Sequence, residues 1–74
     1  MADQKRIDAA KARLKAANLR VLAAHQQVNA DAHFRQAAHP IYPGQAGICT
    51  GKGNVIAAHA ARTLAEADLI EAQI

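Results

Sequence analysis

The chain has 74 residues, a formal net charge of +3 and a hydrophobic fraction of 51%, but twenty of its apolar residues are alanine. Large apolar side chains are therefore few, near the level below which chains struggle to order themselves, and we expect a thin core. No uncharged apolar stretch approaches the roughly 18 residues of a membrane span. The single cysteine, Cys49, excludes an intrachain disulfide and a metal–thiolate cluster.

A seven-residue repeat begins at Arg6. Three consecutive sevens read arginine, an aliphatic residue, any residue and two alanines. As a coiled-coil heptad, this places Ile7, Leu14, Val21 and Val28 at position a, Ala10, Ala17 and Ala24 at d, and Arg6, Arg13 and Arg20 at g. The pattern fails where Asp31 replaces the next alanine. Because alanine favours helices and neither Gly nor Pro interrupts the segment, we predict one helix over about residues 3–37.

A loop rich in glycine and proline is predicted next. Pro40 restricts the preceding residue to extended geometry, and further Pro and Gly residues follow as far as Gly53. Two short apolar pieces, residues 41–42 and 48–50, would pair as a small hairpin or lie as an extended arm on a neighbouring chain. In the second case Tyr42 would be the anchor, with Ile48 beside it.

Asn54 is a good N-cap and precedes a second predicted helix, over about residues 54–74. Its apolar positions have heptad spacing. They are Ile56, Ala60, Thr63, Ala67, Ile70 and Ile74. The expected fold is all-α: an antiparallel hairpin of two helices with alanine-lined seams, joined by the extended loop. This arrangement brings the acidic end of the second helix, with Glu66, Asp68 and Glu71, toward the basic first helix.

No enzyme or cofactor signature is present. The residues that could bind a transition metal are His25, His33, His39, His59 and Cys49, and their spacings match no zinc motif. Residues 47–54 resemble a phosphate-binding loop only superficially, because the Walker spacing is broken. A helix start with Lys52 nearby could still hold an anion.

The arginine stripe Arg6, Arg13 and Arg20 has two interpretations. Regularly spaced cations can follow a nucleic-acid backbone, or they can pair with acids on a partner helix. The modest net charge favours the second interpretation.

Leu19, Leu22, Leu64 and Leu69 lie off both predicted seams, which favours further helix contacts. We therefore expect residues 1–74 to form a single small helical domain that is completed by itself or by another protein. The expected function is that of a non-enzymatic structural subunit that oligomerises or decorates a multi-copy complex such as a virion. Its expected location is the cytoplasm or a virion or similar assembly, and no membrane is involved. The alternative is a small regulator that docks its basic flank on nucleic acid or on an acidic protein surface.

Overall fold

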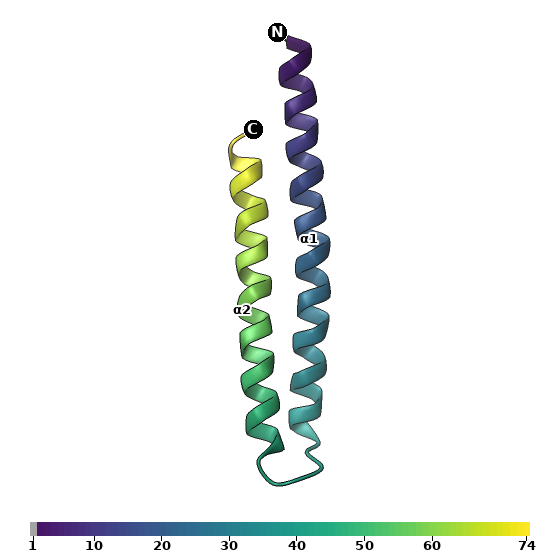
Figure 1. Ribbon diagram of the computed structural model, residues 1–74, viewed down its shortest axis with the longest axis vertical. Coiled ribbons are helices and arrows are strands. Elements are labelled where there is room, and N and C mark those ends of the chain that lie inside the picture. The colour runs from purple at the N-terminus through teal and green to yellow at the C-terminus, as the bar shows by residue number, and fades with distance from the viewer. Residues whose placement is uncertain (1) are drawn as a thin grey trace.

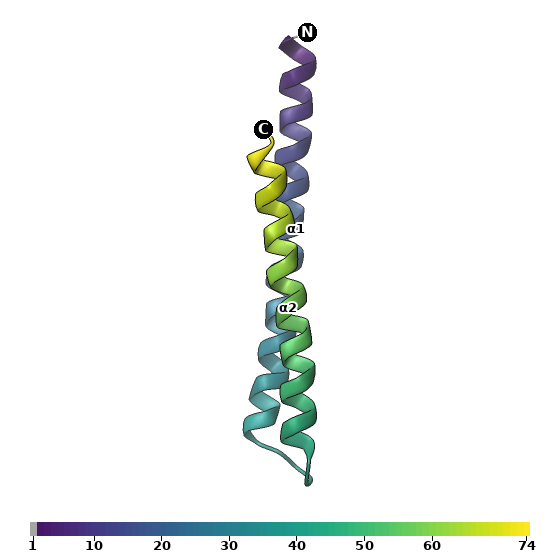
Figure 2. The same ribbon diagram turned by 90° about the vertical axis from the view of Figure 1, so that its left-hand side faces the viewer.

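The computed structural model describes residues 2–74 and consists of two long helices. Helix α1 spans Ala2–Ala38 and helix α2 spans Gln45–Ala72. Figure 1 shows the helices side by side and running in opposite directions, with α1 reaching beyond the end of α2. The molecule is long and thin, with extents of 63 × 13 × 10 Å, and the helices cross at a shallow angle in the side view (Figure 2). The prediction of an all-α two-helix hairpin is confirmed.

The loop between the helices is shorter than predicted, and its last residue permits the reversal. Gly44 has φ +86°, in the left-handed region that side chains disfavour. The backbone N–H of Ile41 donates to the side-chain oxygen of Gln45. The N–H of Gln45 donates to the carbonyl of Tyr42 over 3.2 Å. Gln45 is buried, so the first side chain of α2 closes the turn.

Residues 45–53 form the first turns of α2 and are not the extended loop that the sequence predicted. Asn54 is an exposed residue inside the helix and not its N-cap. Glycine costs roughly 1 kcal/mol relative to alanine in a helix interior, and packing offsets this cost. A Cβ at Gly53 would lie 2.5 Å from the ring of Phe34, so glycine lets the ring pack against α2. Because residues 48–50 are helical, the small hairpin and the extended arm are both wrong.

Helix α1 packs on α2 through a different face from the one predicted. The buried residues Ala16, Ala23 and Ala30 recur every seven positions, and half-buried residues complete the heptad spacing. These half-buried positions are Ala9, Ala12, Leu19, Gln26, His33 and Ala37. All members of the predicted α1 seam are exposed: Ile7, Ala10, Leu14, Ala17, Val21, Ala24 and Val28. The predicted register of the intramolecular seam on α1 is therefore wrong.

The end of α1 nearest the loop explains this choice of face. Because α2 folds back from the loop, its first turns lie against the last turns of α1. There the predicted face carries Asp31 and Arg35, both exposed, whereas the face that packs carries Ala30, His33 and Ala37. Burying the charged side chains without partners would cost several kcal/mol. The face with Ala30, His33 and Ala37 carries no acid, lysine or arginine there, so α2 covers that face.

On α2 the inward face includes most of the predicted seam. Ala60, Thr63 and Ala67 are buried. Ile56 and Ile70 are half-buried, whereas Ile74 at the open end is exposed. The same spacing continues backward through Gly53 to Cys49, which are buried in turns that the sequence had assigned to the loop.

The core that results is thin. Among residues 2–74 no large side chain is fully buried. One polar link joins the helices within the core: the hydroxyl of Thr63 lies 2.9 Å from Oε1 of Gln26 and 2.9 Å from the backbone carbonyl of His59. A hydroxyl has one proton, so it donates to one of these oxygens at a time. Turning the Gln26 amide to present its NH2 group lets the hydroxyl donate to the carbonyl and accept from the amide.

Candidate assembly surfaces

Most large apolar side chains lie outside the hairpin core. On α1 they form what we call the outer α1 face. It consists of Ile7, Ala10, Leu14, Ala17, Val21, Ala24 and Val28. Leu14 is 62% exposed and Val28 is 60% exposed. Single exposed apolar residues are ordinary on a monomer, but a continuous row of them marks a contact surface. The residues predicted as an interface are thus brought together on one face, but α2 does not cover that face.

A second apolar row, which we call the outer α2 face, was missed in the sequence. It consists of Ile48, Gly51, Val55, Ala58, Arg62, Ala65, Leu69 and Ala72, all exposed. Alternating spacings of three and four were the available signal, hidden because residues 48–53 were assigned to a loop. A groove near Ile48, Gly51 and Val55 extends from this row toward His33 of α1. The glycine leaves space between the two large side chains, as a hole for a knob from another helix requires.

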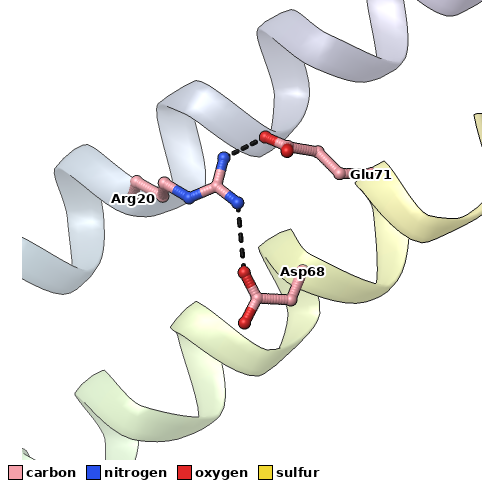
Figure 3. A network of polar contacts seen from close by, with 3 residues as sticks. All are labelled: Arg20, Asp68 and Glu71. Atoms are coloured by element: carbon pink, nitrogen blue, oxygen red, sulfur yellow. Dashed lines mark hydrogen bonds and ion pairs between the residues drawn. The ribbon is translucent and has the colours of Figure 1, made fainter.

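Of the arginine stripe, Arg20 reaches across to α2. Its guanidinium donates to Glu71 and, over 3.1 Å, to Asp68 (Figure 3). These hydrogen bonds, the one to Glu71 first and then the one to Asp68, raise the pKa of Arg20 above its usual value. The side chains of this network remain accessible to water, so salt weakens the interaction. Glu66 instead pairs with Arg62 on its own helix, at 3.6 Å.

The other expected basic residues are not gathered into one site. Arg6 and Arg13 are exposed and make no ion pair within residues 2–74. Lys52 lies inside α2 near the loop, whereas the stripe lies on the N-terminal half of α1. The anion site expected at a helix start near Lys52 is therefore absent from the fold, because that helix starts at Gln45.

The two apolar pieces of the predicted loop are also separated. Ile41 is 85% exposed in the loop, and Tyr42 beside it is 52% exposed. Ile48 belongs to the outer α2 face. Of the leucines outside the predicted seams, Leu19 is half-buried at the helix contact, while the others are exposed. Those exposed leucines are Leu22, Leu64 and Leu69.

The histidines and the cysteine are dispersed. Cys49 is buried as a free thiol, and His33 is half-buried while His25, His39 and His59 are exposed. Within residues 2–74 no three His, Cys, Asp or Glu side chains are grouped as a metal site would need. Neither α1 nor α2 has an apolar stretch long enough to cross a membrane.

Comparison of the chain with protein-family models, with curated proteins and with solved structures gives no significant match.

Proposed function

We propose that this protein is a small non-enzymatic assembly subunit that oligomerises or decorates a larger multi-copy complex. A virion is one such complex. The observation that carries the proposal is the outer α1 face, where Leu14, Val21 and Val28 lie exposed in one heptad row. A row with this spacing is the pattern through which one helix packs along another.

The thin core supports the same conclusion. The residues buried within the hairpin are alanines, one cysteine, one glycine, Gln45 and Thr63. Burying a Val, Leu or Ile side chain contributes about 1.5–3 kcal/mol, and most of that gain is unrealised here because the large side chains are exposed. Contacts with further helices would bury these side chains and gain that free energy. Assembly thus supplies the stabilisation that a small isolated chain lacks.

The alternative function, binding to nucleic acid or to an acidic protein surface, depends on the arginine stripe. Of its three members, Arg20 is already bound to Asp68 and Glu71. The remaining stripe offers Arg6 and Arg13, which is a small electrostatic footprint for a duplex. An apolar assembly responds little to salt, whereas phosphate binding weakens steeply with it.

The experiment that tests the proposal combines light scattering with circular dichroism on the purified chain. We expect a helical protein whose mass exceeds the 7.8 kDa of one chain at micromolar concentration. We also expect that mass to persist when the ionic strength is raised. A cooperatively folded single chain at that concentration would contradict the proposal. Mass that collapses in moderate salt, together with retention on DNA at low salt, would favour the alternative.

A further inference from the structure

The outer α1 face and the outer α2 face lie on opposite edges of a hairpin that is one helix thick. Each face is turned away from the contact between the two helices, because the inward residues of each helix occupy its other side. We propose that copies of this chain join edge to edge, the outer α1 face of one copy packing on the outer α2 face of the next. This inference rests on the proposed assembly function and specifies its partner and its geometry.

The two faces match in shape. Each alternates a large residue with a small one: Leu14 and Ala17 on α1, and Val55 and Ala58 on α2, are examples. Small residues let two helix backbones approach closely while the large residues fill the spaces between them. The same alternation of small and larger side chains builds the contact within the hairpin. The joint between copies therefore uses the same kind of packing as the contact of α1 with α2.

The charges beside the faces favour this pairing over the parallel pairing of like faces. The outer α1 face is flanked in its N-terminal half by Arg6, Lys11 and Arg13, all exposed. The outer α2 face is flanked in its C-terminal half by Glu66 and Asp68, also exposed. Two α1 faces running in the same direction would bring bases together, and two α2 faces running in the same direction would bring acids together. An α1 face against an α2 face pairs bases with acids when the helices run in opposite directions and one copy is shifted along the other so that Arg13 lies level with Glu66.

A joint between unlike faces leaves one free face at each end of every assembly. Such heterologous contacts generate rings when the rotation closes and open arrays when it does not. They do not stop at a symmetric dimer. This difference makes the inference testable with two variants, each of which has lost one face.

The first variant, Leu14→Gln with Val21→Gln, removes the α1 face without changing the charge. The second variant, Val55→Gln with Leu69→Gln, removes the α2 face in the same way. All four positions are exposed in the hairpin, so neither variant removes a buried contact within one chain. The control is Leu22→Gln with Leu64→Gln, which also replaces two large apolar side chains by glutamine, at exposed positions off both faces.

Light scattering at equal concentration is the readout. We expect the wild type and the control to form assemblies larger than a dimer, and each face variant alone to have the mass of one chain. An equimolar mixture of the two variants should then give twice the 7.8 kDa of one chain and nothing larger, because one intact α1 face meets one intact α2 face. If either variant loses helix alone, the helical signal should return on mixing.

Three results would overturn the inference. One is a face variant that dimerises alone, because that means like faces pair. Another is a mixture of the two variants that keeps the mass of one chain while the wild type assembles. The third is that each variant alone assembles like the wild type. A folded wild type with the mass of one chain would instead contradict the proposed assembly function itself.

Discussion

The register of the hairpin can be tested at two adjacent alanines. Ala16 has no accessible surface, whereas Ala17 is exposed. Leucine adds three carbons and has a helix propensity close to that of alanine, so the two substitutions differ mainly in packing. Overpacking a close contact costs about 1–3 kcal/mol, which we expect for Ala16→Leu. For Ala17→Leu we expect a change within about 0.5 kcal/mol in the single chain.

Thermal and urea unfolding, followed by circular dichroism, measures both variants. For a chain of this size each kcal/mol corresponds to about 4–8 °C in Tm, so the expected difference is well resolved. The measurement is made in the background of Val55→Gln with Leu69→Gln, where we expect the mass of one chain, because Ala17 belongs to the outer α1 face and assembly would add its own effect. Ala32→Leu, at another exposed alanine, is the control. Equal losses at Ala16 and Ala17, or a larger loss at Ala17, would refute the register described above.

Three further predictions concern the contacts between the helices. Gly51→Ala, with open space around the new Cβ, should raise the unfolding free energy by up to about 1 kcal/mol. Gly53→Ala should not show this gain, because its new Cβ would collide with the ring of Phe34; equal gains of the two variants in urea unfolding would contradict this contact. Arg20→Glu should lower Tm through repulsion by the two carboxylates, and the loss should shrink at high salt; a salt-independent loss would point to another cause. Thr63→Val should lower the free energy of unfolding by about 0.5–1.5 kcal/mol in chemical unfolding. Thr63→Val with Gln26→Leu should recover most of that loss, because the double change leaves no unpaired polar group; strictly additive losses would argue against the hydrogen bond between the two residues.

The sequence by itself determined that the chain forms two long helices, but it left open a small hairpin in the segment between them. Alanine content and the absence of Gly and Pro predicted α1 within one residue at each end. Heptad spacing identified Ala60, Thr63 and Ala67 on the inward face of α2. The glycines before Asn54 misled the prediction of where α2 begins. Their local cost was visible in the sequence, but the ring of Phe34 that packs on Gly53 is far away along the chain.

Tertiary structure alone decided which face of α1 is covered. Two rows on α1 have heptad spacing, and the row with larger side chains, such as Leu14 and Val21, predicted the contact. The row with larger side chains is the expected contact for a helix whose pairing is not constrained by a loop, because larger side chains bury more surface. A helix that folds back across a short loop must instead pack first on the turns beside the loop. On those turns one face carries Asp31 and Arg35, whose burial would be costly. The alanine row was therefore covered, and the aliphatic row stayed exposed.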